Sequence, residues 1–284
     1  MYPQNFFSLF PPFPRNNKVF VAMSFDKKFD SRWVNVIAPT IRKVQINGVS
    51  LNPYRVDMSR ISDSILTDIV EGIRSSLLIL ADITVIGNIN GKPVRNGNVM
   101  YEIGIAQAIR LSEEVVLFRS DKDEILFDLA NIRVNFYDPD RDPIKASTIL
   151  GESLIGALSE IDHKKSLAVK HATESLDFDC LQLLIQAGAS PTKTVDQPVI
   201  RTMRDVMSKT RVLMAISRLL ELGLLTAQFI ELTTALESLD PDAQAEKILK
   251  YRITPFGEAV VEQIAEKMGL PTLKDADELK DFYV

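Results

Sequence analysis

An unbroken apolar run, LLILADIT at 77–84, constrains the fold of this chain more than any other stretch. A strand with one solvent-facing side alternates apolar and polar residues, whereas this run has no polar residue before Asp82. We therefore expect a strand that is buried on both faces. Such strands occur in parallel sheets that helices cover on both sides. After a short insert, the segment NGNVMYEIGIAQA predicts a helix with Asn98 as its N-cap.

The alternation of strands and helices continues on both sides of this run. Apolar runs predict strands at 18–25, 50–57 and 114–119, and helical spacing predicts helices at 29–46 and from Ile61 to Ile73. In the insert at 85–98, Asn90-Gly91 predicts the turn of a short β-ribbon over the site. Residues 124–138 are expected to hold a loop and an edge strand. This order indicates an α/β fold with a doubly wound parallel sheet, whose ligands bind at the carboxyl ends of the strands.

The chain is long enough for two domains, with flanking segments of a different character. Residues 1–17, rich in Phe and Pro, predict an extended arm before the α/β domain at 18–142. Residues 143–172 predict either one linking helix or two helices separated by a break at 163–165. The last part, 173–284, is expected to fold as helices at 176–188 (ending at a Gly C-cap), 194–207 and 210–225, two strands at 226–232 and 248–254, and a closing helix from Pro255. Its segments SRLLELGLLT and YRITPFGEAVVE resemble winged-helix families in general.

The amino-acid composition argues against several classes of protein. An apolar content of 46% with 25% charged residues is typical of a globular chain, and a net charge of −5 argues against general affinity for nucleic acid or anionic membrane. A single cysteine, Cys180, and two histidines exclude a disulfide framework and argue against a zinc site, so no metal or cofactor is expected. No signal peptide and no long apolar run is present, which predicts a cytoplasmic protein without a membrane span.

The charge of the last part bears on what a winged helix here would bind. Residues 164–284 carry 15 basic and 18 acidic side chains, a net charge of −3, whereas DNA binding normally leaves a basic footprint. The expected recognition helix offers Lys209, Arg211 and Arg218, which a solvated helix face explains equally well. Dimerisation or protein contact is therefore favoured over DNA binding.

Glu102 is the leading candidate for chemistry. At about 100° per residue it lies at the centre of the apolar arc of its helix, flanked by Ile105, Ala106 and Ile109. A carboxylate in a buried stripe is costly unless it is paired or used, and we expect the nearby helix N-terminus to favour its ionised form. An ionised, partly desolvated Glu at the carboxyl edge of a sheet suits a nucleophile or a ligand-binding group. The alternative is a capping or core-rim Glu that backbone N–H groups satisfy.

The segments VFVAMSF, YRVD, LILADIT, NVMYEIGIAQA and FDL…R…Y (127–137) together resemble the nucleoside 2-deoxyribosyltransferase superfamily, and more closely its bacterial TIR-like, nucleotide-binding branch. The resemblance implies a flavodoxin-like fold and cleavage of an N-glycosidic bond in a nucleoside, nucleotide or NAD-type molecule. In the transferases the glutamate of this helix attacks the anomeric carbon, and Glu102 occupies that position. Two departures are Leu77, where the family often has an acid, and Phe20, where many transferases have a tyrosine. They imply an altered substrate, hydrolysis in place of transfer, or no catalysis.

Further candidates follow from the carboxyl edge and from this chemistry. Asp82 or Asp57 could protonate the leaving base if its pKa is raised, and Arg55 could bind a phosphate or orient Glu102. The alternatives are a salt bridge between Arg55 and Asp57 and, for Asp82, a cap on the following loop. The expected catalytic residues are Glu102 and Asp82, and the expected substrate-binding residues are Met23, Ser24, Phe25, Arg55, Asp57, Thr84, Asn98 and Tyr101.

Three functions remain open at this stage. The first is an N-glycosidase or deoxyribosyltransferase-like enzyme with Glu102 as nucleophile. The second is a non-catalytic nucleotide sensor that acts through its winged helix, which the changes at Leu77 and Phe20 favour. The third is a TIR-like, NAD-hydrolysing defence effector. A homodimer is expected, because related sites are often completed by a neighbouring subunit and the aromatic arm needs cover.

Overall fold

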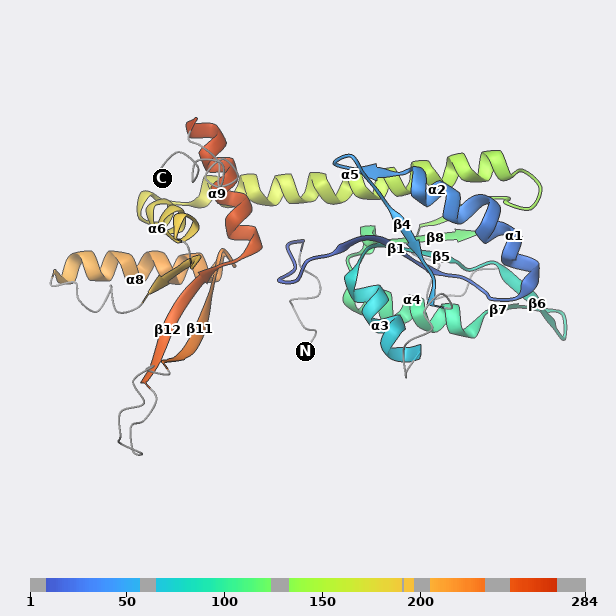
Figure 1. Ribbon diagram of the computed structural model, residues 1–284, viewed down its shortest axis with the longest axis horizontal. Coiled ribbons are helices and arrows are strands. Elements are labelled where there is room, and N and C mark those ends of the chain that lie inside the picture. The colour runs from blue at the N-terminus through green and yellow to red at the C-terminus, as the bar shows by residue number, and fades with distance from the viewer. Residues whose placement is uncertain are drawn as a thin grey trace, which may run out of the picture. The chain divides into compact units, whose positions relative to one another are not determined.

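The computed structural model describes residues 9–56, 65–123, 133–190, 192–196, 205–232 and 246–269. The chain divides into two compact units, residues 1–164 and 165–284. The division lies inside one long helix, α5 (Pro143–Ser175) (Figure 1).

The first unit is built on a five-stranded parallel sheet. Its order is β4 (Asn52–Tyr54), β1 (Asn16–Ala22), β5 (Ser76–Asp82), β8 (Val115–Arg119) and β9 (Val134–Phe136). Along the chain this order is 2-1-3-4-5, which is consistent with a flavodoxin-like sheet. The predicted central strand is confirmed: Leu78 and Leu80 of β5 point into one apolar cluster, and Ile79 and Ala81 into the other.

Helices cover both faces of the sheet, as the α/β prediction requires (Figure 1). On one face lie α1 (Asp30–Arg32), a π-helical turn (Trp33–Ile37), α2 (Ala38–Lys43) and the first part of α5. On the other lie α3 (Ile65–Ser75) and α4 (Gly97–Ile109). Short 3₁₀ turns at Lys27–Phe29 and Ser112–Glu114 and a small hairpin, β2 (Gln45–Ile46) and β3 (Val49–Ser50), complete the unit.

Close packing explains one glycine of α3. A Cβ on Gly72 would lie 2.7 Å from the ring of Phe20 and 2.8 Å from that of Tyr54. The helix therefore approaches the sheet closely only because this residue has no side chain.

The insert forms the predicted ribbon. Strands β6 (Val85–Ile89) and β7 (Lys92–Arg95) are antiparallel, and Asn90 and Gly91 between them adopt positive φ angles of 52° and 77°. Two consecutive positive φ angles define the turn that the Asn-Gly pair favours.

The second unit contains helices α6 (Phe178–Ala189), α8 (Val206–Glu221) and α9 (Pro255–Met268). A three-stranded antiparallel sheet accompanies them, in the order β10 (Thr194–Asp196), β12 (Glu246–Ile253) and β11 (Leu225–Leu232). The strands expected at 226–232 and 248–254 and the closing helix are confirmed. Thr254 caps α9 through its hydroxyl, and Gly269 ends it with a φ of 63°.

Two sequence-based assignments were wrong, and one open alternative is decided. The helix expected at 194–207 begins instead as strand β10, because Val195 pairs with Tyr251 of β12, a partner that local spacing cannot reveal; residues 197–204 lie outside the described chain. Of the two alternatives for the linking segment, the single helix is present, since α5 continues through 163–165. The C-cap of α6 is Ser190 rather than a glycine, and a Cβ on Gly188 would lie 3.4 Å from the Val261 side chain.

None of the helices in the described ranges combines enough apolar residues with enough length to cross a membrane.

Candidate functional site

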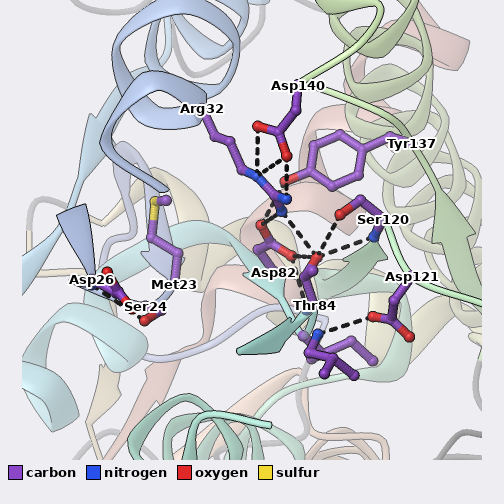
Figure 2. Close-up of polar contacts among 12 residues, drawn as sticks. Met23, Ser24, Asp26, Arg32, Asp82, Thr84, Ser120, Asp121, Tyr137 and Asp140 are labelled. Carbon is purple, nitrogen blue, oxygen red and sulfur yellow. Dashed lines mark hydrogen bonds and ion pairs between the residues drawn. The ribbon is translucent and has the colours of Figure 1, made fainter. Parts of the chain in front are cut away.

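Polar side chains gather where the parallel strands of the first unit end. Ser24 follows β1, Asp82 ends β5, Ser120 follows β8 and Tyr137 follows β9. Figure 2 shows these residues at one edge of the sheet. Parallel sheets of this kind bind ligands at the carboxyl ends of their strands, so these residues form the candidate site.

Asp82 is surrounded by hydrogen-bond donors (Figure 2). The Tyr137 hydroxyl donates to Oδ2 at 2.8 Å, and Arg32 Nη1 donates to the same oxygen at 3.2 Å. The backbone N–H of Thr84 donates to Oδ1 at 3.0 Å, and the Thr84 hydroxyl donates there too. The side chain is only 6% exposed. Both carboxyl oxygens of Asp82 therefore accept hydrogen bonds. The contact with the Thr84 backbone shows that Asp82 also caps the following loop, which was one alternative for this residue.

Arg32 links this carboxylate to a second one. Its Nε lies 3.1 Å from both oxygens of Asp140. Burial tends to lower the pKa of Arg32, but the hydrogen bond to Asp140 and the charge of Asp82 outweigh it and raise the pKa. Burial and the neighbouring Asp82 also raise the pKa of Tyr137 well above its ordinary value. Arg32 is thus a cation and Tyr137 a neutral donor, and both donate hydrogen bonds to the Asp82 carboxyl group.

Arg55 contacts Met23 and Phe25, two of the predicted site residues that follow β1. The guanidinium carbon of Arg55 lies 5.2 Å from the ring centroid of Phe25 and 4.8 Å from that of Trp33. Its Nη1 lies 3.8 Å from the Met23 sulfur. Cation–π contacts of this kind fix a guanidinium in place. Asp57, whose salt bridge with Arg55 was one alternative, lies outside the described residues.

Asn96, which the sequence analysis missed, joins Ser24 to the helix that carries Glu102. Its amide nitrogen donates to the Ser24 hydroxyl at 3.2 Å, and its carbonyl oxygen accepts from the backbone nitrogens of Asn98 and Val99 at 2.9 and 3.3 Å. Asn96, not Asn98, is therefore the N-cap of α4. Both asparagines of the NGN segment could serve as caps, and the end of the ribbon at Arg95 selects the first.

A second pair missed by sequence fixes the base of the ribbon. Arg95 Nη2 lies 3.2 Å from Oδ1 of Asp121, and the backbone N–H of Val85 donates to Oδ2 of Asp121 at 3.0 Å. Burial tends to raise the pKa of Asp121, but the hydrogen bonds from Arg95 and Val85 lower it overall. Asp121 thus holds both ends of the ribbon beside the end of β8.

Glu102 lies on the buried face of α4, as predicted, with Val99, Ile103 and Ala106. It is 8% exposed, and burial raises its pKa to about 7. Its carboxylate has no hydrogen bond or ion pair with any described residue. The sixth helical residue is beyond the free N–H groups of the first turn. The expectation that the helix N-terminus favours the ionised form of Glu102 is therefore corrected, because desolvation raises its pKa.

The other candidates differ in exposure. Tyr101 is 58% exposed and Asn98 is exposed, so neither belongs to the buried face of α4. Thr84 is buried, and its hydroxyl oxygen accepts from Arg32 Nη1 at 3.1 Å and from the Ser120 backbone at 3.0 Å. Tyr137 was part of the family resemblance, whereas no local pattern distinguished Arg32, Asp121 or Asp140.

A hollow of about 770 Å³ in the first unit lies away from all the predicted site residues. It is lined by residues around the starts of β8 and β9 and along α5, among them Val115, Arg133 and Ile149. Over the part of the chain that the structure describes, no three His, Cys, Asp or Glu side chains are grouped so as to hold a metal ion.

Comparisons with known proteins add little to this geometry. No family model matches the chain, and no curated protein matches it. Among solved structures, it is similar to the metal-soaked Flv1 flavodiiron core from Synechocystis sp. PCC6803, at 17% identity and a TM-score of 0.34. The match covers 49% of this chain and 36% of that one. A similarity at this level supports no conclusion about activity.

Proposed function

We propose that the first unit cleaves or transfers the N-glycosidic bond of a nucleoside-, nucleotide- or NAD-type molecule, with Glu102 as the nucleophile. One observation carries the proposal: a buried carboxylate with a pKa of about 7 that no described residue pairs. An unpaired buried carboxylate is unfavourable for folding and is common where a group has a chemical task.

The chemistry suits such a group. The carboxylate attacks the anomeric carbon, the C–N bond breaks, and its electron pair leaves with the base. Water or a second acceptor then takes the sugar from Glu102 and regenerates the carboxylate. The transition state carries positive charge on the sugar, which a desolvated anion stabilises strongly because little water screens it. A nucleophile must be ionised, so activity is expected to rise with pH through about 7.

The hydrogen bonds around Asp82 favour one substrate class. A base that leaves as an anion needs a proton donor, and both oxygens of Asp82 are already engaged as acceptors of hydrogen bonds from Tyr137, Arg32 and Thr84. A pyridinium base, as in NAD-type molecules, leaves as a neutral molecule and needs no acid. We therefore place NAD-type substrates, the class of the TIR-like effector hypothesis, ahead of ordinary nucleosides.

The test is release of free base. The protein is incubated separately with nucleosides, nucleotides and NAD, and the free base is measured by mass spectrometry. Glu102→Gln keeps the shape of the side chain but removes the nucleophile, so base release should fall to background while the circular dichroism spectrum is unchanged. Glu152→Gln, an exposed change on α5, is the matched control. Undiminished release by Glu102→Gln refutes the proposal.

A non-catalytic nucleotide sensor is the second candidate. It is favoured by the full set of donors around Asp82 and by Phe20, which is wholly buried against Tyr54 where many transferases have a polar tyrosine. A sensor would retain a nucleotide through gel filtration, release no base, and still bind it in the Glu102→Gln variant.

For the second unit we propose a winged-helix-like module that contacts protein rather than DNA. Two antiparallel strands of its three-stranded sheet, β11 and β12, follow α8, the expected recognition helix. On that helix Arg211 is paired with Asp179 at 2.7 Å, while Val206, Met207 and Met214 are exposed. An exposed apolar face fits homodimerisation better than a phosphate backbone does. Light scattering should give a dimer mass, and a gel shift in low salt should show no DNA binding. A cytoplasmic location without membrane attachment completes the proposal.

A further inference from the structure

A second hollow lies at the opposite edge of the sheet from the candidate active site. It measures about 430 Å³ and is lined by Arg15, Asn16, Asn17, Lys18 and Asn52. Asn16 to Lys18 start β1 and Asn52 starts β4, and the two strands run side by side with Lys18 paired to Asn52. The hollow is therefore at the amino edge of the sheet, whereas Ser24 and Asp82 mark the carboxyl edge.

The lining has the composition of an anion site. It consists of two cationic side chains and three carboxamides, and it contains no acid. The Lys18 ammonium lies 5.2 Å from the ring centroid of Tyr54, a cation–π contact that restricts its position. Amides and cations supply N–H donors that converge on one space.

The charge beneath the hollow is unbalanced. Arg15 has a side chain only 10% exposed and forms an ion pair with the buried Glu114. Glu114 is also bound by Arg110, whose Nε lies 2.7 Å from it, and by the backbone N–H of Leu111 at 3.0 Å. Two buried guanidinium groups thus share one carboxylate, which leaves an excess positive charge.

The two arginines differ in how well they are satisfied. Arg110 donates to the backbone carbonyls of Ile73, Ser76 and Leu77, so it serves the fold directly. The Nε of Arg15 is buried and has no hydrogen-bond partner. Burial lowers the pKa of Arg15 to about 10, and burial together with Arg15 lowers the pKa of Arg110 to about 9. A nearby anion would relieve both effects.

We propose that this hollow binds a phosphate-type oxyanion, held by Arg15 and Lys18 and by the amides of the three asparagines. The surplus guanidinium charge supplies the attraction, and tetrahedral oxygens match the several donors around the space. The ligand is inorganic phosphate or the phosphate group of a small metabolite. The site is separate from the candidate active site and does not depend on the proposed reaction.

The first test is calorimetric titration with inorganic phosphate at constant ionic strength, with sodium chloride as the balancing salt. Wild-type protein should bind, and its melting temperature should rise with phosphate concentration. Lys18→Met and Asn52→Ala remove two donors from the wall without disturbing the Arg15–Glu114 pair, so each should weaken binding at least tenfold. No heat of binding, and no rise in melting temperature beyond that in chloride, would overturn the proposal.

Two further variants locate the site. Lys92→Met removes an exposed cation of the ribbon and is the matched control, with unchanged affinity expected. Arg55→Met removes the cation nearest the end of β1 at the opposite edge, and binding should again be unchanged. Lost binding in Arg55→Met with normal binding in Lys18→Met would place the phosphate in the candidate active site and refute the inference.

Titration with adenosine monophosphate then separates the two sources: tighter binding than inorganic phosphate indicates a metabolite, and equal affinity indicates the free ion.

Discussion

The buried carboxylate of Glu102 should make the first unit less stable as the pH rises. Its pKa is about 7 in the folded chain, against an ordinary value of 4.5. Between these values the folded state binds more protons than the unfolded state, so stability is lost as pH increases. Each pH unit is worth at most about 1.4 kcal/mol, and the loss relative to acid conditions should reach about 3 kcal/mol by pH 8 but stay below about 1 kcal/mol at pH 5.

Glu102→Gln removes this titration. The variant should therefore gain about 2 kcal/mol on the wild type between pH 5 and pH 8, whatever constant difference the amide itself introduces. Trp33 is the single tryptophan and lies in the first unit, so urea unfolding followed by its fluorescence reports on that unit alone. Glu152→Gln, at an exposed position, should give a difference that does not change with pH. A pH-independent gap between Glu102→Gln and wild type would refute the reasoning.

Three other changes test the contacts described above. Tyr137→Phe deletes the 2.8 Å hydrogen bond to Asp82 and should destabilise the first unit by roughly 1–3 kcal/mol, measured by Trp fluorescence in urea; a cost near zero would show that the hydroxyl does not hold the carboxylate. Asn96→Ala removes the helix cap and should cost about 1 kcal/mol in the same assay, and an unchanged midpoint would argue against Asn96 as the cap. Gly257→Ala places a Cβ 2.3 Å from the backbone oxygen of Leu224, so melting of the second unit by circular dichroism should shift downward; an unchanged melt would contradict that close approach.

Features that depend on local pattern were predicted from sequence. The apolar run at 77–84 led to a central parallel strand because only burial on both faces explains such a run. The Asn-Gly pair led to the ribbon turn because few residues tolerate two consecutive positive φ angles. The burial of Glu102 followed from helical periodicity.

Features that depend on distant partners were not predicted. Arg32 contacts Asp82 across 50 residues and Asp140 across 108, and neither spacing leaves a periodic trace in the sequence. Strand β10 exists because β12 pairs with it, while its own residues suggested a helix. Asn96 and Asn98 are equivalent as cap signals, and only the end of the ribbon distinguishes them.

The two carboxylates expected to be catalytic are buried to the same degree but differ in their surroundings. Asp82 is compensated by Arg32, Tyr137 and Thr84, so its burial strengthens the fold and leaves its oxygens engaged. Glu102 has no such donors among the described residues, so the energy of its desolvation is not recovered within the protein. That uncompensated energy is available to a cationic partner, and a sugar that develops positive charge at its anomeric carbon is such a partner. The loss of stability predicted as Glu102 ionises and the reactivity proposed for it therefore have one physical origin, and removing the carboxylate should abolish both.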